Sequence, residues 1–243
     1  MTKLLFALWI ALILVCGCLE DNPSSHATTT TLKLASGIEK AEDCRNLESP
    51  FEQDFCYYNF AVWTNDSTIC PRIHDVYYKE ECYGGIGLNV GNQSIINFIG
   101  DVDHRNVFYA VFRKNPSICE LIANQSYKDL CYYSAGSLLN NRTSCNNVVN
   151  KGVKELCFEG MALSLNDSSL CGEIQANDSR DMCYGNVAIN SRNLTVCDKL
   201  QNTPHNLHDW CYAEVSIRRN DSSICESIQD EGWKKVCYNR GYQ

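Results

Sequence analysis

The spacing of the cysteines constrains the fold of this chain more than any other feature. Sixteen cysteines stand among 243 residues, and fourteen of them, from Cys44 to Cys237, fall into seven pairs. The two members of a pair stand at positions i and i+12, as Cys44 and Cys56 do, or at i and i+14 in one case. The next pair begins 14 residues later, except across one longer gap between Cys82 and Cys119. The resulting period of about 26 residues predicts a tandem repeat, since periods of about 20–50 residues are typical of stacked repeats.

The longer gap is itself one unit of the repeat. Its two cysteine positions fall on Ile96 and Arg105, so the spacing between them is shorter than in the other units. If cysteines bonded across units, losing these positions would orphan Cys82 and Cys119, whereas bonding within units removes one whole disulfide. The sequence therefore predicts seven disulfides, each inside one unit: Cys44 with Cys56, Cys70 with Cys82, Cys119 with Cys131, Cys145 with Cys157, Cys171 with Cys183, Cys197 with Cys211, and Cys225 with Cys237.

The first cysteine of each pair is expected in a short helix of about two turns. From the second unit to the eighth, Asp or Asn stands four residues before the first cysteine position and Ser or Thr two residues before it, and both types are typical of a helix start. Ser117 with Glu120, and Ser223 with Glu226, have the spacing of a capping box. Three residues after the first cysteine position every unit is apolar: Leu47, Ile73, Ile99, Ile122, Val148, Ile174, Leu200 and Ile228.

The second cysteine is expected inside a longer helix. Ser49-Pro50 marks the start of one such helix, with proline at the first helical position. Acidic residues two before this cysteine are expected to favour the start of their own helix through its dipole: Asp54, Glu80, Asp129, Glu155, Asp181 and Asp209. An aromatic residue follows the cysteine in all seven pairs: Tyr57, Tyr83, Tyr132, Phe158, Tyr184, Tyr212 and Tyr238. We interpret this aromatic column as core between units, the alternative being a ligand-stacking ladder.

The predicted fold is all-α, because a two-helix unit of this length cannot bury its own apolar face and must stack on its neighbours. We expect an α-solenoid of eight helical hairpins over residues 38–243, seven of them with an internal disulfide. Closing a loop of about 13 residues stabilises a hairpin by roughly 3 kcal/mol in the chain-entropy model. The arrangement resembles secreted, disulfide-bonded relatives of tetratricopeptide repeats, although those have a longer repeat of about 34 residues.

Residues 1–17 have the layout of an export signal. Lys3 is followed by an apolar run from Leu4 to Val15, which is shorter than the ~20 residues of a membrane-spanning helix. The tetrad Val15-Cys16-Gly17-Cys18 resembles the lipobox of prokaryotic lipoproteins. That resemblance implies removal of residues 1–17 and a diacylglyceryl group on Cys18, with plain secretion as the alternative. Residues 18–37 are polar and are expected to form a tether.

Composition and motifs narrow the function without identifying it. A net charge of −8 at pH 7 argues against a nucleic-acid-binding face. No serine, cysteine or histidine stands in a recognisable nucleophile setting, so we assign no catalytic residue, cofactor or metal ligand. We expect a binding or scaffolding protein, lipid-anchored at the outer face of the cell membrane, whose partner is an extracellular protein or peptide. The alternatives are a structural envelope protein and, after it, a secreted enzyme or an enzyme inhibitor.

Two polar groups could hold a divalent metal, although solvated polar side chains are the simpler interpretation of both. One lies in the lengthened sixth disulfide loop and comprises His205, His208 and Asp209. The other lies in the unit without cysteines and comprises Asp101, Asp103 and His104.

Eight Asn-x-Ser/Thr sequons occur, and six of them coincide with the predicted starts of the short helices. Asn124 and Asn177 lie instead in the loop inside a hairpin, where helix capping explains them less well. These two are therefore the expected N-glycosylation sites.

The third unit, residues 92–117, lacks a disulfide and three residues of its loop. It is either a hinge or a unit that has exchanged its disulfide for a larger apolar core. A hinge would open more readily than its neighbours, because packing without a cross-link leaves local unfolding accessible. Glycines just before this unit, each costing up to about 1 kcal/mol in a helix interior, favour the hinge: Gly84, Gly85, Gly87 and Gly91.

Replacing Cys18 with Ser is expected to release the protein from the membrane fraction. The reason is that two acyl chains anchor a protein stably, whereas a chain without them has no such hold. Fractionation and immunoblotting measure this. Retention of the Cys18→Ser protein in the membrane would mean that the apolar run is an uncleaved anchor.

Overall fold

The computed structural model describes residues 40–200 and 206–241. Within these two stretches the chain is all-helical, and no β-strand occurs in them. None of the described helices is both long and apolar enough to cross a bilayer. The described residues belong to one compact unit, Glu39–Gln243. The predicted signal peptide, the tether with Cys18, and His205 lie outside the described residues.

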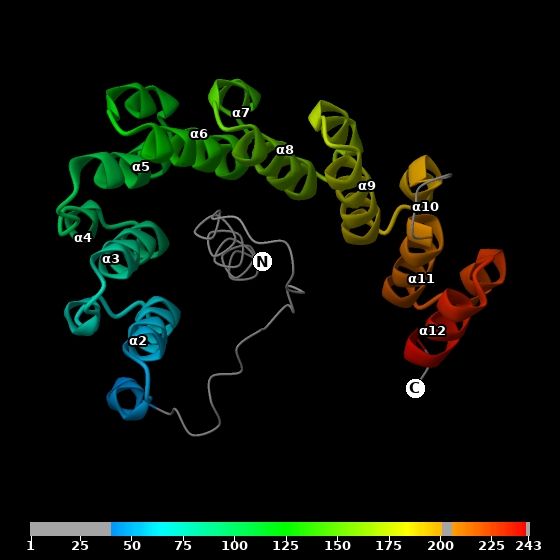
Figure 1. Ribbon diagram of the computed structural model, residues 1–243, viewed down its shortest axis with the longest axis horizontal. Coiled ribbons are helices and arrows are strands. Elements are labelled where there is room, and N and C mark those ends of the chain that lie inside the picture. Colours follow the sequence, from blue (N-terminus) through cyan, green and yellow to red (C-terminus); the bar gives the residue numbers. More distant parts are fainter. Residues whose placement is uncertain (1–39, 201–205, 242–243) are drawn as a thin grey trace. The chain divides into compact units, whose positions relative to one another are not determined.

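Long helices follow one another along the chain (Figure 1). Each of them contacts the next long helix in the sequence. They are α2 (Pro50–Thr64), α3 (Val76–Val90), α5 (Val102–Phe112), α6 (Gln125–Leu139), α8 (Lys151–Leu165), α9 (Asn177–Ser191), α11 (Leu207–Arg219) and α12 (Glu231–Gly241).

A short helix precedes each long one, and we call such a pair a unit. The short helices, most of them 3-10 helices, are η1 (Ala41–Asn46), η2 (Cys70–Arg72), α4 (Gln93–Ile96), η3 (Pro116–Leu121), α7 (Arg142–Asn147), η4 (Ser168–Glu173), α10 (Leu194–Cys197) with η5 (Asp198–Leu200), and η7 (Ser222–Ser227). Each packs against the long helix of its own unit. From η2 onward, each unit's short helix also packs against the long helix of the preceding unit, so it links two units.

Seven disulfides join the short helix of a unit to its long helix, with the connectivity that the spacing predicts. The bonded Cα atoms are 5.5–5.8 Å apart, which is the ordinary separation for a disulfide. Disulfides of this number indicate an oxidising, extracytoplasmic compartment.

The starts of the short helices differ in one respect from the sequence prediction. The side-chain oxygen of the Asp or Asn at the cap accepts the backbone N–H of the Ser or Thr two residues later, as Asn115 does from Ser117 at 3.2 Å. The predicted capping boxes at Ser117 and Ser223 are wrong, because the helix begins two residues earlier. Glu120 instead accepts the hydroxyl of Tyr132 at 3.2 Å, and Glu226 in the last unit accepts that of Tyr238.

The start of α2 follows the prediction. Ser49 caps this helix, Pro50 occupies the first helical position, and Glu52 completes a capping box with Ser49.

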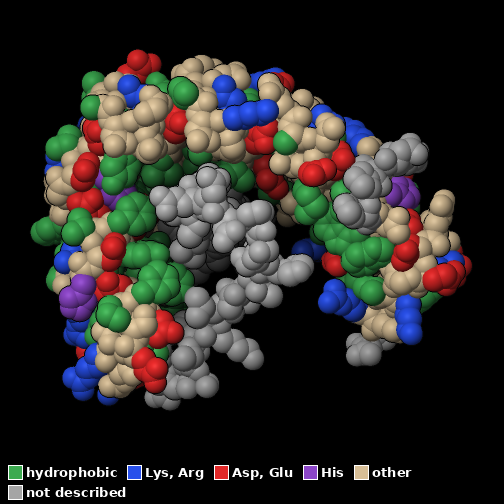
Figure 2. Space-filling view, in the orientation of Figure 1, with side chains coloured by type: hydrophobic (Ala, Val, Ile, Leu, Met, Phe, Trp, Pro, Cys, Tyr) green, Lys and Arg blue, Asp and Glu red, His purple; other side chains and the backbone are tan. Residues whose placement is uncertain are grey.

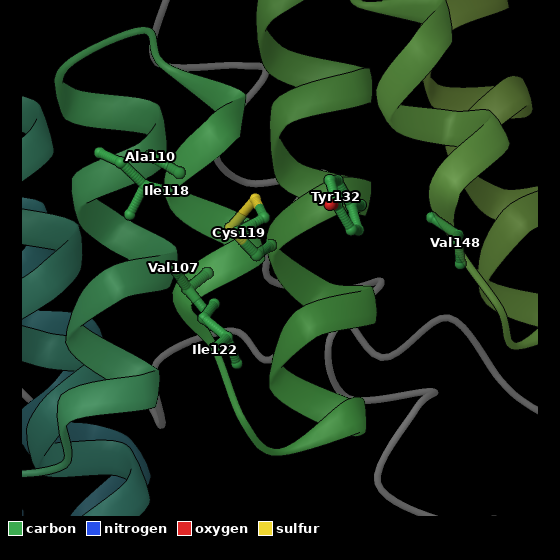
Figure 3. Close-up of a cluster of buried hydrophobic side chains, with 8 residues drawn as sticks. Val107, Ala110, Ile118, Cys119, Ile122, Tyr132 and Val148 are labelled. Carbon is green, nitrogen blue, oxygen red and sulfur yellow. A yellow bond between two sulfur atoms is a disulfide. The ribbon is translucent and has the colours of Figure 1, made fainter.

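The apolar columns form cores that two neighbouring units share. Figure 3 shows one such cluster, which joins α5, the η3 segment and α6 and extends to Val148 at the end of α7 in the following unit. Its buried members are Val107, Ala110, Ile118, Cys119, Ile122, Cys131, Tyr132 and Val148. The aromatic column contributes to these cores, since Tyr57, Tyr132 and Phe158 are buried. Only toward the end of the described chain does it become exposed, at Tyr238.

A column of small residues, which the sequence analysis missed, receives the disulfide of the following unit. A Cβ atom on Gly136 would lie only 2.4 Å from the Sγ atoms of Cys145 and Cys157. Five residues after the second cysteine position, the first seven units carry the buried residues Ala61, Gly87, Ala110, Gly136, Ala162, Ala188 and Ser216. The disulfide of Cys145 with Cys157 therefore serves as a packing surface between units as well as a cross-link within one, and Ser216 likewise lies 3.4 Å from the Sγ atom of Cys225.

The third unit fills the same space without a disulfide. Ile96 stands at the first cysteine position, and a Cβ atom on Gly87 would lie 2.5 Å from its Cγ1 atom. The ring of Phe108 packs in the same way against Gly84, at 2.3 Å from such a Cβ. Gly84 and Gly87 therefore have a packing role, and Gly91 ends α3 with a φ of +67°.

The three residues missing from the third unit come from its long helix. The loop from Ile96 to the cap residue Asp101 has the same length as the loop from Cys119 to Asn124. Helix α5 has 11 residues, whereas α6 has 15. The expectation of a shortened loop was wrong, and the site described below gives the reason: the loop backbone is bonded to the preceding unit.

Gly136→Ala is expected to lower the free energy of unfolding by about 1–3 kcal/mol, because the added methyl group overlaps the next unit's disulfide. The matched control is Gly152→Ala in the first turn of α8, where a Cβ atom would have only an ordinary contact at 3.5 Å. That change should stabilise the helix by up to about 1 kcal/mol. Urea unfolding followed by circular dichroism measures both. Equal stability of the two variants would contradict the packing role of the disulfide.

Candidate functional site

The acidic residue two positions before the second cysteine bonds to the backbone of the next unit. Asp129 on α6 accepts the N–H groups of Val149 and Asn150 at 2.9 and 2.8 Å. Asp54 on α2 accepts those of His74 and Asp75, both at 2.8 Å. We call these acids the crossing carboxylates.

The same interaction recurs along the chain, with donors 20 or 21 residues after the acid. The acids are Glu80, Asp103, Glu155 and Asp209, and their donors are Gly100 and Asp101, Ala123 and Asn124, Ala176, and Asp230. Most of these N–H groups belong to the start of the next long helix, where backbone donors lack helical partners and the dipole favours an anion. These acids thus bond to the start of the following helix, a contact that the sequence analysis did not predict. Asp209 also lies in the first turn of its own helix, as predicted.

The crossing hydrogen bonds affect proton binding. Burial acts to raise the pKa of the Asp54 carboxyl, but the amide N–H groups of His74 and Asp75 outweigh it and lower that pKa below its usual value. A lowered folded-state pKa contributes stability that is present above the unfolded value and is lost as the pH falls through the folded one.

The first and the last units depart from this pattern. In the first unit the N–H of Ser49 is bonded to the side chain of Glu52 within its own helix, at 3.3 Å. In the last unit Lys235 stands at the position of the crossing carboxylate and is exposed. A lysine cannot accept a hydrogen bond.

A buried charged cluster links the second and third units. His104 on α5 is fully buried between two nearly buried carboxylates of α3. Its Nδ1 lies 2.8 Å from Oε2 of Glu80, and its Nε2 lies 2.8 Å from Oε1 of Glu81. Glu80 also accepts the N–H groups of Gly100 and Asp101 through its other oxygen, so it combines a crossing carboxylate with a bond to the imidazole.

Burial acts to lower the pKa of His104, but the hydrogen bonds and negative charges of Glu81 and Glu80 outweigh it, and the net effect raises the pKa. Sequence reasoning placed His104 with Asp101 and Asp103. In the structure Asp101 caps α5 by accepting the N–H of His104 at 2.9 Å, and Asp103 is a crossing carboxylate.

Five rings form a continuous chain across α2, α3, α5 and α6. Phe51 meets Tyr78 with ring centroids 6.0 Å apart, and Tyr78 meets Tyr77 at 5.9 Å. Tyr77 stacks on His104 at 5.3 Å, and His104 stacks on Tyr127 at 4.9 Å. We call this series the ring chain.

One end of the ring chain is open to solvent. Phe51 is 56% exposed, and Tyr77, Tyr78 and Tyr127 are half-buried. Figure 2 shows hydrophobic side chains gathered along α2, α3 and α5 on the face in view. The sequence analysis missed this surface because its members occupy different positions in successive units, so no single column reveals it.

No group of three histidine, cysteine, aspartate or glutamate side chains in the described stretches is arranged to hold a metal ion. His205 of the lengthened loop lies outside them. His208 contacts its neighbour Asp209 at 3.2 Å and packs on the ring of Tyr212, with centroids 4.4 Å apart.

The two preferred sequons differ in structure. Asn124 caps α6, and its side-chain oxygen accepts the N–H groups of Ser126 and Tyr127 at 2.9 and 3.3 Å. Capping therefore explains Asn124 after all. Asn177 is the first residue of α9, is exposed, and accepts a bond from Arg180 at 2.7 Å. Glycosylation at either position stays a prediction.

Comparisons with protein-family models, with curated proteins and with solved structures find no match to this chain.

Asp129→Asn is expected to lower the free energy of unfolding by about 1.5–3 kcal/mol, because an amide has one acceptor oxygen for two backbone donors and loses the charge. The control is Asp178→Asn, the same change at an exposed residue in the first turn of α9. It should cost less than about 1 kcal/mol. Chemical denaturation of both variants gives the comparison, and a cost for Asp129→Asn no larger than the control's would refute the inter-unit role.

Proposed function

We propose that this chain is a binding or scaffolding protein displayed at the outer face of the cell membrane and anchored there by lipid on Cys18. Its folded part is an α-solenoid of eight helical hairpins. The partner is an extracellular protein or peptide.

The contacts between units support the solenoid. Each described long helix packs on the next, and each short helix after the first packs on two long helices. The crossing carboxylates add a directed polar interaction from one unit to the following one. Arrays of this kind are stabilised by nearest-neighbour interfaces and offer extended surfaces for binding.

The observation that carries the proposal is the ring chain. Aromatic side chains are enriched at protein interfaces, and they often supply a large share of the binding energy when they are buried there. Phe51 is more than half exposed. Its ring centroid lies 6.1 Å from that of Phe55 and 6.0 Å from that of Tyr78, so one side of the ring is packed and the other is open. An exposed aromatic at the end of a packed series is a suitable anchor for a partner's apolar side chain.

The disulfides support the proposed location. A chain that closes seven disulfides folds in an oxidising compartment. The lipobox-like tetrad ending at Cys18 would then attach the folded units to the membrane through the polar tether.

The test is affinity capture from detergent extracts of the native envelope with the Cys18→Ser protein as bait, followed by a binding measurement with the captured partner. Phe51→Ala is expected to weaken that binding by about tenfold or more, as truncation of an interface anchor does. The exposed position of Phe51 means that the fold should tolerate the change.

The matched control is Trp63→Ala. Trp63 lies near the other end of α2, is 73% exposed and is not part of the ring chain. Its removal should leave the affinity within about twofold, the range of neutral interface or surface positions. A loss of binding with Trp63→Ala but not with Phe51→Ala would overturn the placement of the binding surface.

A further inference from the structure

A histidine and two carboxylates meet where the third unit packs on the second. Both ring nitrogens of His104 lie 2.8 Å from carboxylate oxygens, one from Glu80 and one from Glu81. An ionised carboxylate can only accept, and a neutral imidazole has only one N–H to donate. Two such bonds therefore require one proton more than a neutral histidine and two carboxylates contain, whether it resides on the ring or on a carboxyl group.

This arrangement lies at the boundary between the second unit and the third, which lacks a disulfide. His104 occupies the position just before Arg105, and Glu81 stands at the same position of the preceding unit. Elsewhere this column is apolar: Phe55, Leu130, Leu156, Met182, Trp210 and Val236. The interface between α3 and α5 thus carries an ion pair in a column that is apolar in the other units. It adjoins the unit whose own two helices have no disulfide between them.

We propose that the proton shared by Glu80, His104 and Glu81 fastens α5 to α3 at the unit that has no disulfide between its own two helices, and that its release loosens the third unit, which makes this unit a pH-responsive joint. Without the proton, one hydrogen bond is lost and two buried carboxylates face each other across a neutral ring. Leaving a buried charge unpaired is strongly destabilising.

The groups around His104 favour retention of the proton. Tyr77, Glu80 and Glu81 face it from α3, and Tyr127 faces it from α6. On its own helix, Asp101 and Asp103 are the nearby acids. The guanidinium of Arg105 is directed to the carbonyl of Ile99, at 3.1 Å. Burial raises the pKa of both Tyr77 and Tyr127, so these phenols stay neutral where His104 titrates.

The direction of the pH effect follows from linkage. The pKa of His104 is raised in the folded protein, so its contribution to stability is complete below the unfolded value of about 6.5. That contribution is lost as the pH rises through the higher folded value. The joint is therefore closed at mildly acidic pH and looser on the alkaline side.

Hydrogen exchange measured by mass spectrometry on the mature protein, from about pH 6 to pH 9, tests the proposal. Protection factors, which correct for the intrinsic effect of pH, are compared between residues 92–112 and the disulfide-bonded residues 142–165. Protection of the third unit is expected to fall at least about tenfold across the titration, while that of the fifth unit stays level. Imidazole ¹⁵N shifts should show His104 doubly protonated at the lower end of the range.

Two variants separate the joint from general alkaline instability. His104→Gln, which cannot carry the charge, should show weak protection of the third unit at every pH. His208→Gln, the control, should keep the wild-type response. A neutral His104 ring at pH 6 together with unprotonated carboxyls would overturn the proposal, as would a loss of protection shared equally by both units. These wild-type measurements decide the matter even if His104→Gln does not fold.

Discussion

The bond from a carboxylate in one unit to the backbone of the next is the interaction on which the rest of this structure depends. Most of the described loops between a short and a long helix carry N–H groups at a partly buried helix start, and an unpaired donor there would cost about 1–3 kcal/mol. Asp129 supplies both acceptors for one such loop. In the units from the second onward that show this bond, the acceptor comes from the preceding unit. The polar backbone thereby couples neighbours in one direction along the chain, in addition to the apolar surface that they share.

This requirement explains what the third unit kept and what it lost. Its disulfide could be replaced by Ile96 packing on Gly87, because only volume had to be conserved at that place. Its long helix could lose a turn. Its loop kept its length, which leaves the N–H groups of Gly100 and Asp101 within reach of Glu80. In this unit the loop that receives the crossing carboxylate was kept while the covalent bond was not.

Much of the fold could be predicted from the sequence, because the cysteine and apolar columns recur once in every unit and each column marks one helix face. The pairing of Cys119 with Cys131 and the start of α2 at Ser49 followed from such local patterns. The bond from Asp129 to the backbone of Val149 could not be predicted in this way. An acidic residue that recurs at one position of the repeat does not reveal which group 20 residues later it contacts. Glu81 and His104 stand at a position that is apolar in the other units. A search for residue types shared by all units therefore does not detect the ion pair between them.

The first and last units have a consequence for how copies of this molecule meet. A stack of like units has complementary top and bottom surfaces, so two molecules could in principle join head to tail and continue as an open filament. Growth of that kind needs a free acceptor at one end and free donors at the other. Lys235 presents a cation where the acceptor would be, and Glu52 already occupies the N–H of Ser49. The N–H of Ser49 and the acceptor position at Lys235 are thus not available for the contact that joins neighbouring units.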